Sequence, residues 1–284
     1  MRVTGRPPTI DEPMRHLRST ALRVPLAEPM SIELFEALNR EYAAHPLVPA
    51  PPEYDHDTLV DRATARLAAI HPRVDLAAKD VLVFGCGNGY EVWFLADAYA
   101  SRATGIDIVE HGGWAGLSGP GRTFVMADLA TEQPFPAASF DRIVSINVFE
   151  HVSHPTSTLA ELYRVLRPGG LAWITANLYR GPKASHRYRE IHFPWPHLLF
   201  GDDVVAEFYR RQGLPEQGSE WVNKLTWEQY RERIEALGFR IRRQKLLETP
   251  IDEDLYRRFE RILGRYPRAD LARDFFQVVL EKPG

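Results

Sequence analysis

The sequence predicts an α/β fold with a doubly wound, mostly parallel β-sheet, and two observations support that prediction. Apolar runs of strand length alternate with helical patterns from residue 80 onward, as in proteins whose parallel strands are joined by helices. The first of these runs ends in a glycine-rich turn that leads into a helix. With 284 residues, 44% of them hydrophobic and 26% charged, the chain can bury a sizeable core.

Charge and cysteine usage exclude several classes of function. The formal net charge of −3 gives no electrostatic basis for binding nucleic acid or an anionic membrane. The single cysteine, Cys86, excludes an intrachain disulfide and a cysteine-based zinc site. No run reaches the roughly 18–20 apolar residues that span a bilayer, and the Arg-rich start lacks the apolar stretch of a secretion signal. We therefore expect a cytoplasmic protein with no membrane or nucleic-acid partner.

Residues 1–79 are expected to form an arm followed by a helical cap. Residues 1–30 are rich in Pro and Arg without periodicity, which predicts an extended arm. Ser31 is expected to cap a helix over 31–45, and a second helix begins near Asp57 and ends near Pro72. The apolar positions at helical spacing are Leu34, Phe35, Leu38 and Tyr42 in the first helix, and Leu59, Ala63, Leu67 and Ile70 in the second.

Residues 80–284 are expected to form the main domain. The predicted strands are 81–85, 103–107, 122–128, 141–147, 171–177, 239–247 and 274–282. The predicted helices are 90–100, 155–166, 226–238 and 252–264. Pro168-Gly169-Gly170 is expected to stop the second of these helices, and Thr226 with Gln229 forms a capping box at the start of the third.

An insertion over residues 179–225 interrupts the alternation of strands and helices. It is rich in aromatic and histidine residues: Tyr179, His186, Tyr188, His192, Phe193, Trp195, His197 and Phe200. Such a long break inside a domain is commonly functional. Two interpretations stay open, because aromatic side chains can form either a lid over an acceptor pocket or a second hydrophobic core.

The segment VLVFGCGNGYE is the most specific local feature. Gly85, Gly87 and Gly89 make a turn between a buried strand and a helix, where the backbone N–H groups can meet a carboxylate or a phosphate. Tyr90 stands where a dinucleotide fingerprint has its third glycine, and the Gly-Lys-Ser/Thr of a P-loop is absent. The spacing therefore disfavours NAD, FAD and ATP.

Two acids end the next two predicted strands. Asp107 lies 18 residues after Gly89 and can accept both hydroxyls of a ribose, while Asp128 can accept the amino group of an adenine. Because the carboxyl ends of parallel strands meet at one edge of the sheet, we expect both acids beside the glycine turn. S-Adenosylmethionine is a ligand with an amino-acid end, a ribose and an adenine, and it would satisfy all three sites.

The order of these motifs resembles the class I S-adenosylmethionine-dependent methyltransferases, in the small-molecule branch similar to methyltransferase type 11. The resemblance spans about residues 80–176, through VLVFGCGNGYE, TGIDIVE, MADL, FPAASFDRIVSINVFEHV and LYRVLRPGGLAWIT. It implies a Rossmann-like sheet with an antiparallel last strand, S-adenosylmethionine as cofactor, and a homodimer as an open option. The cofactor contacts it implies are Phe84, Gly85, Cys86, Gly87, Gly89, Asp107, Ile108, Asp128, Leu129 and Asn147.

One departure from the family pattern concerns the methionine end of the cofactor. Val83 stands where the family usually has an acid. Asn147 and the backbone near residue 85 are the substitutes that we expect.

Three histidines are candidate general bases for a hydroxyl acceptor: His151, His186 and His192. A packing or capping role is the alternative for His151. A metal bound by His186, His192 and His197 with Glu190 is a weaker alternative, because no standard ligand spacing is present, and we expect none. Cys86 is expected to pack rather than react.

The sequence thus predicts a methyltransferase acting on an O or N atom of a small molecule such as a metabolite, sugar or secondary product. An RNA or protein methyltransferase, a homologue that binds the cofactor without methylating, and another reaction of S-adenosylmethionine remain alternatives.

Overall fold

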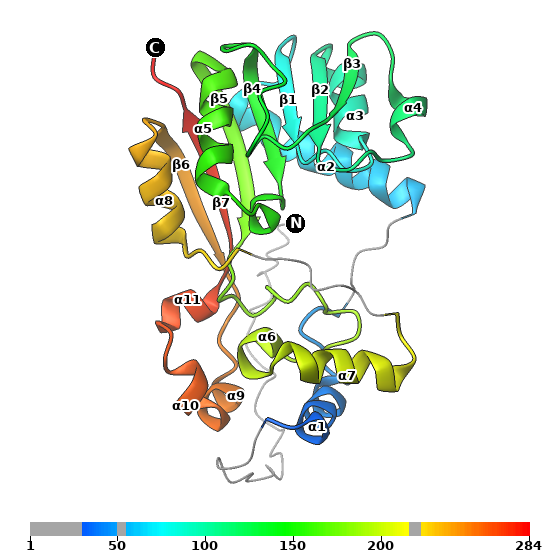
Figure 1. Cartoon of the computed structure of the whole chain (residues 1–284), viewed down its shortest axis with the longest axis vertical. Coiled ribbons are helices and arrows are strands. Elements are labelled where there is room, and N and C mark those ends of the chain that lie inside the picture. Colours follow the sequence, from blue (N-terminus) through cyan, green and yellow to red (C-terminus); the bar gives the residue numbers. More distant parts are fainter. Residues whose placement is uncertain (1–29, 50–54, 216–222) are drawn as a thin grey trace, which may run out of the picture.

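The computed structural model describes residues 30–49, 55–215 and 223–284, so the predicted arm lies outside the described residues except for Met30. Its centre is a seven-stranded sheet with the order β3-β2-β1-β4-β5-β7-β6 (Figure 1). The strands are β1 (Asp80–Phe84), β2 (Arg102–Asp107), β3 (Arg122–Met126), β4 (Phe140–Ile146), β5 (Leu166–Asn177), β6 (Arg240–Glu248) and β7 (Arg273–Glu281).

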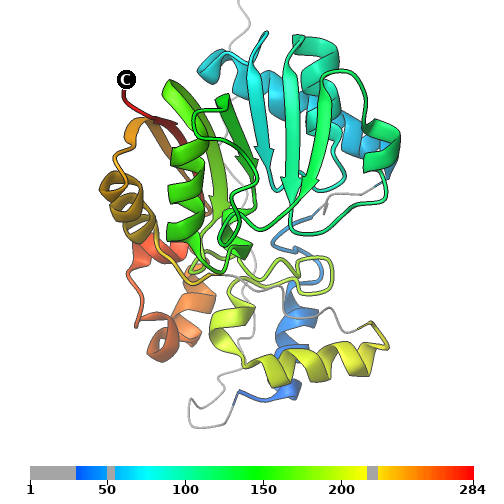
Figure 2. The same ribbon diagram turned by 45° about the horizontal axis from the view of Figure 1, so that its top comes forward.

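The pairing of the strands confirms the predicted topology. The strands β3, β2, β1, β4 and β5 pair in parallel, and β7 is antiparallel to both of its neighbours, β5 and β6. Each crossover between parallel strands needs a connection that passes over one face of the sheet. The carboxyl ends of the parallel strands therefore share one edge, which Figure 2 shows pointing toward the segments after residue 178.

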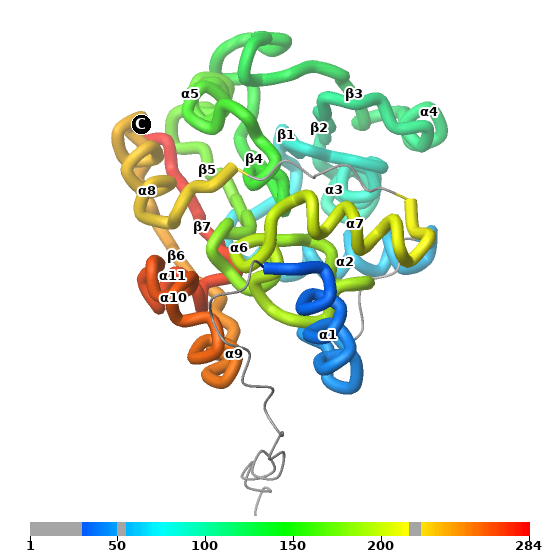
Figure 3. Tube along the Cα trace, turned by 60° about the horizontal axis from the view of Figure 1, so that its bottom comes forward, coloured from blue at the N-terminus to red at the C-terminus, as the bar shows by residue number. Residues whose placement is uncertain are grey.

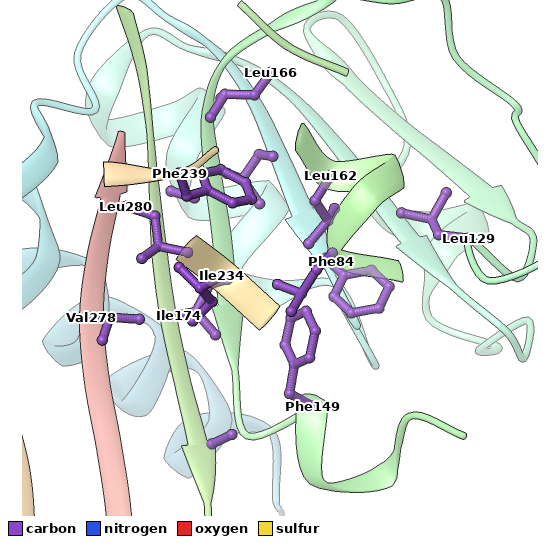
Figure 4. Close-up of a cluster of buried hydrophobic side chains, with 14 of the residues drawn as sticks. Phe84, Leu129, Phe149, Leu162, Leu166, Ile174, Ile234, Phe239, Val278 and Leu280 are labelled. Atoms are coloured by element: carbon purple, nitrogen blue, oxygen red, sulfur yellow. The ribbon is translucent and has the colours of Figure 1, made fainter. Parts of the chain in front are cut away.

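Helices cover both faces of this sheet. The helices α2 (His56–Val74) and α3 (Tyr90–Tyr99) pack on one face through residues such as Leu67 and Leu95. The helices α5 (Pro155–Val165) and α8 (Trp227–Ala236) pack on the other. Figure 4 shows this second face, where Leu162 and Ile234 lie in one cluster with Phe84 and Ile174 of the strands.

A second hydrophobic core lies beyond the strand tips. It joins α1 (Ile32–Tyr42), α6 (Pro196–Leu199) and α7 (Asp202–Gln212) to α9 (Glu253–Arg258), α10 (Glu260–Leu263) and α11 (Arg268–Ala272) (Figure 3). Phe35 of α1 is at its centre, with ring centroids 5.2 Å from Phe193 and 5.0 Å from Phe200. Phe193, Trp195 and Phe200 are buried here, so these aromatic residues of the insertion form a core rather than a pocket wall.

Polar contacts also join α1 to distant parts of this second core. The Asn39 amide donates to the Glu190 carbonyl (2.8 Å) and accepts from the His192 N–H (2.7 Å). The Tyr42 hydroxyl donates to Asp252 (2.6 Å), and Arg258 pairs with Glu41 at 2.7 Å. Thus α1 packs with the insertion, whereas α2 packs against the sheet.

Most predicted element boundaries hold within a few residues. Ser31 accepts from the Leu34 N–H, Thr226 and Gln229 form the capping box, and Gly238 has φ +90° just after α8. These contacts confirm the predicted starts of α1 and α8, because caps depend on residues close in sequence.

Some elements differ in detail from the prediction. The helix α2 continues past Pro72, because Val74 is buried and the Asp75 N–H bonds to the His71 carbonyl. The helix α5 ends at Val165, close to its predicted end at 166, but β5 begins at Leu166 rather than at the predicted residue 171. The predicted helix 252–264 is two short helices that meet at Phe259, whose backbone is not helical. The one-turn helices α4 (Trp114–Leu117) and α11 were not predicted, since they are too short for a periodic pattern.

No helix among the described residues is long and apolar enough to cross a bilayer.

Candidate functional site

The glycine turn lies at the carboxyl end of β1. The N–H groups of Gly85 and Cys86 both donate to the Ile106 carbonyl of β2, at 2.8 and 3.1 Å. Gly85 has φ +71°, and a Cβ there would lie 2.2 Å from the Val148 side chain. The chain therefore folds back closely at this point, and only glycine fits.

Gly87 lies in the middle of the turn and is partly exposed. It has φ +49°, and a Cβ built on it would meet no atom within 4 Å. Its N–H donates to Asp107 Oδ2 (2.9 Å), and its carbonyl accepts from the Trp114 indole (2.7 Å). The turn is thus held on both sides while open space remains beside it, which is the form of a backbone cradle for a ligand.

Asp107 ends β2 beside this turn. Its other oxygen, Oδ1, accepts from the Val109 N–H at 3.4 Å, and the His111 Nε2 lies 3.9 Å from Oδ2. Gly87 therefore fixes the position of the carboxylate, and Oδ1, with its long contact, keeps capacity for a hydroxyl donor.

Two apolar side chains next to Asp107 are unusually exposed. Ile108 is 67% exposed, and Met126, which pairs with Asp107 across β2 and β3, is 60% exposed. Apolar groups exposed at a sheet edge commonly mark a binding surface. Here they offer a surface for a flat, apolar-faced group such as a nucleobase.

The remaining residues predicted to contact the cofactor include one polar side chain and three buried apolar ones. Asp128 accepts from the Ala130 N–H (2.8 Å), and its own N–H donates to Glu132, so it also shapes the turn after β3. Leu129 and Phe84 are buried in the sheet core, as is Cys86 on the opposite face. Burial raises the pKa of the Cys86 thiol, which leaves it protonated near neutrality.

A hollow of about 190 Å³ lies between the glycine turn and α2. Arg62 and Arg66 line it from α2, and Val83 and Ile146 line it from β1 and β4. Arg66 pairs with Glu91 of α3, Nη1 to Oε1, at 2.8 Å. This hollow therefore combines positive and negative charge next to the N-terminus of α3.

Asn147 follows β4 in a strained conformation. It has φ +56°, its N–H donates to the Thr175 carbonyl (2.9 Å), and its side-chain oxygen accepts from the Thr175 hydroxyl (3.2 Å). A left-handed non-glycine residue costs about 1–3 kcal/mol and is found most often at functional sites. The fold thus holds Asn147 in place at the tip of β4.

Glu150, His151 and His186 come together just beyond β4. Each offers a ligand atom, and these atoms lie within 4.8 Å of one another, the one such group of three among the described residues. The rings of His151 and His186 have centroids 5.2 Å apart, and His186 has φ +55°. Glu150 is fully buried and His151 is exposed. Two histidines and a carboxylate can hold a divalent cation or move a proton.

The other histidine candidates lie elsewhere in the fold. The backbone N–H of His192 donates to the side chain of Asn39 on α1. The Glu190 carboxylate accepts from the Tyr209 hydroxyl (3.1 Å). The His197 Nε2 bonds to the Tyr179 carbonyl (2.7 Å), and burial lowers the pKa of His197 to about 4. Of the residues considered together for a metal, the structure brings only His186 into the three-residue group, with Glu150 and His151 as its partners.

Several site residues were not found by sequence reasoning. Arg62 and Arg66 are spaced by four residues on α2. That spacing alone does not distinguish a binding site from a solvent-exposed helix face. Trp114 stacks on Phe124, with centroids 5.3 Å apart, and lies on a one-turn helix that no pattern signals. Their contacts to the glycine turn depend on the tertiary fold.

The central part of the chain is similar in sequence to known methyltransferases. Residues 82–174 match the family model described as a methyltransferase domain. An uncharacterized methyltransferase of Mycobacterium marinum (strain ATCC BAA-535 / M) is 35% identical over 147 residues, covering 49% of this chain and 53% of that protein. A ubiquinone biosynthesis O-methyltransferase of Pseudomonas savastanoi pv. phaseolicola (strain 1448A / Race 6) is 34% identical over 143 residues, covering 46% and 58%. The chain thus spans about half the length of the curated relatives it matches.

Solved structures agree on the fold. The crystal structure of an S-adenosylmethionine-dependent methyltransferase from Mesorhizobium loti superposes with a TM-score of 0.52 at 20% identity, over 78% of this chain and 99% of that one. The family match covers the glycine turn, Asp107, Asp128 and the segment after β4, which are the parts of the site described above. Residues 82–174 thus resemble a methyltransferase domain, and the chain has the fold of a solved S-adenosylmethionine-dependent methyltransferase.

Proposed function

We propose that this protein transfers the methyl group of S-adenosylmethionine to an oxygen or nitrogen atom of a small molecule. The observation that carries the proposal is the open glycine turn, whose Gly87 N–H is bonded to Asp107. The family match and the name of the Pseudomonas relative support it. We also propose that the insertion 179–225 borders the acceptor site only on the side where His186 meets His151, and that the protein acts in the cytoplasm.

The residues of the site fit each part of the cofactor. Asp107 would accept the ribose hydroxyls, and Ile108 and Met126 would cover the base, with Asp128 near its amino group. The Arg66–Glu91 pair matches a group that carries both a carboxylate and an ammonium. It lies beside Val83, so this pair would take over the role of the acid that the family usually has there.

When bound at the glycine turn and Asp107, the cofactor would supply an electrophilic methyl group on a positively charged sulfur that can leave with its bonding electron pair. The chain's own residues would position the acceptor for in-line attack. A hydroxyl acceptor must also lose its proton, and we assign that proton to a ring nitrogen of His151. His186, in contact with His151, would orient it, while His192, whose backbone N–H bonds to Asn39 of α1, is assigned no role.

Two measurements on the whole chain test this function. Calorimetry with S-adenosylhomocysteine is expected to show binding at one site. Incubation with methyl-labelled S-adenosylmethionine and fractions of a small-molecule extract is expected to move label to a product. Label that appears in RNA or protein instead would contradict a small-molecule acceptor. Tight binding without any transfer, over many fractions, would indicate a homologue that does not methylate.

A further inference from the structure

A second hollow lies directly beside the one next to the glycine turn. It has a volume of about 290 Å³ and opens between α2 and the face of β4, β5, β7 and β6. Arg66 and Ile146 line both hollows. A group bound in the second hollow would therefore reach the cofactor's amino-acid end across the tip of β4, which is the arrangement a transfer between two ligands needs.

The walls of this second hollow are apolar and partly aromatic. Trp173 of β5 and Phe275 of β7 line it from the sheet, and Leu247 lines it from β6. Ala69 and Ile70 line it from α2, on the face that also presents Arg66, since residues three and four apart are neighbours on a helix. Among the described residues that line the hollow, Arg66 alone is charged, and it is already paired with Glu91. The hollow therefore suits a neutral group with apolar faces.

On the side of the second hollow that the sheet forms, the polar side chains lie in one row across the strands. Thr175 and Gln277 are paired across β5 and β7, and Thr175 bonds to Asn147 at the boundary with the cofactor hollow. Asn177 occupies the next position of β5 on the same face, because alternate residues of a strand point the same way. It is 1% exposed, and neither polar atom of its side chain has a hydrogen-bond partner among the described residues. Asn177 does not line the hollow, so the polar groups that a ligand there would meet on the sheet are those of Asn147, Thr175 and Gln277.

The size of the hollow narrows the choice of ligand. A cavity of about 150 Å³ holds benzene, and typical small-molecule sites start near 300 Å³. A volume of about 290 Å³ therefore matches one substituted ring. Aromatic and aliphatic walls with hydrogen-bonding groups on one side favour a flat ring that carries a hydroxyl.

We propose that this hollow is the acceptor subsite and that it takes a neutral, single-ring phenol, with the hydroxyl directed toward Asn147. This inference rests on the proposed function, because it names the acceptor class for the same cofactor site. Trp173 and Phe275 provide the faces for the ring, and Asn147 and Thr175 lie on the side of the cofactor.

The test uses the full chain with 4-methylphenol as probe and S-adenosylhomocysteine present. Ala69 is exposed on α2 and lines the hollow, so Ala69→Phe fills the hollow without disturbing the core. Ala68→Phe, at the exposed neighbouring position outside the lining, is the matched control. Saturation-transfer NMR is expected to detect the phenol on the native chain and on Ala68→Phe, with at least tenfold weaker binding to Ala69→Phe. Leu247→Trp, which narrows the hollow from β6, is expected to act like Ala69→Phe.

The outcomes separate this inference from the proposed function. S-Adenosylhomocysteine is expected to bind all variants equally. If the phenol binds Ala69→Phe as well as the native chain, or if methyl glucoside binds and the phenol does not, the phenol subsite is overturned while the methyltransferase proposal stands. If S-adenosylhomocysteine does not bind the native chain, the proposed function itself fails. A thermal melt of each variant shows that it is folded.

Discussion

The sheet and the second core beyond its strand tips differ in the kind of contact that holds each together. At the sheet, the glycine turn meets Asp107 through a single hydrogen bond between adjacent strand ends. In the second core, Phe35 reaches Phe193 and Phe200 across more than 150 residues of sequence. The cofactor half is thus organised by short local motifs, whereas the other half is organised by packing between residues far apart in sequence. His151 and His186 lie where the two meet.

The largest effect is expected from removing the centre of the second core. Phe35→Ala deletes a fully buried ring and is expected to lower the free energy of unfolding by about 3–5 kcal/mol. If the two regions are as separate as their clusters indicate, S-adenosylhomocysteine binding measured below the unfolding transition should change little. A large loss of that binding in folded protein would show that the second core supports the cofactor site directly.

The next largest effect concerns the place where the two regions meet. His151→Ala is expected to lower kcat by about 10²–10⁴-fold for a hydroxyl acceptor, because the general base is lost, and to leave cofactor affinity unchanged. His154→Ala, an exposed histidine before α5, is the control. Steady-state rates across the pH range check this, and an unaltered kcat would remove His151 from proton transfer.

A smaller effect is expected at the glycine turn. Asp107→Ala removes the acceptor for Gly87 and for the ribose, so the affinity for S-adenosylhomocysteine should fall by more than ~1 kcal/mol. Asp97→Ala, an exposed acid on α3, should leave the affinity unchanged. Titration calorimetry on both variants makes the comparison, and equal affinities would place the ribose elsewhere.

The smallest effect is expected from pH. Burial lowers the pKa of His197 to about 4, from about 6.5 in an unfolded chain. Between these values the unfolded state binds the extra proton, so this residue's contribution to stability is complete above about pH 6.5 and is lost as the pH falls toward 4. Urea unfolding at pH 7 and pH 5 should therefore show a smaller pH difference for His197→Gln than for the native chain.

The cofactor half could be predicted from sequence because its signals are local. The glycine spacing, Asp107 and the capping box at Thr226 each depend on residues close together in the chain, and the strand and helix order followed from periodicity. The topology, including the antiparallel β7, agrees with the prediction.

The rest of the site depends on contacts that no local pattern contains. Arg66 meets Glu91 only because α2 crosses α3, and His186 meets His151 only after the insertion folds back over β4. His186 and His192 looked equivalent in sequence, but the His192 backbone bonds to Asn39 of α1, whereas the His186 ring lies beside His151. The aromatic residues of the insertion likewise gave no sign of whether they faced a ligand or Phe35.

The contacts of α1 also bear on how the chain acquires its structure during synthesis. The hydrogen bond from Tyr42 to Asp252 can form only after 210 further residues have been synthesised. The bond from Asn39 to the Glu190 carbonyl needs 151 further residues. Contacts of such high sequence separation are slow to form, because a long loop must close first. Phe35 therefore lacks its aromatic partners until residues 193–208 have been made, which leaves the apolar face of α1 exposed during synthesis.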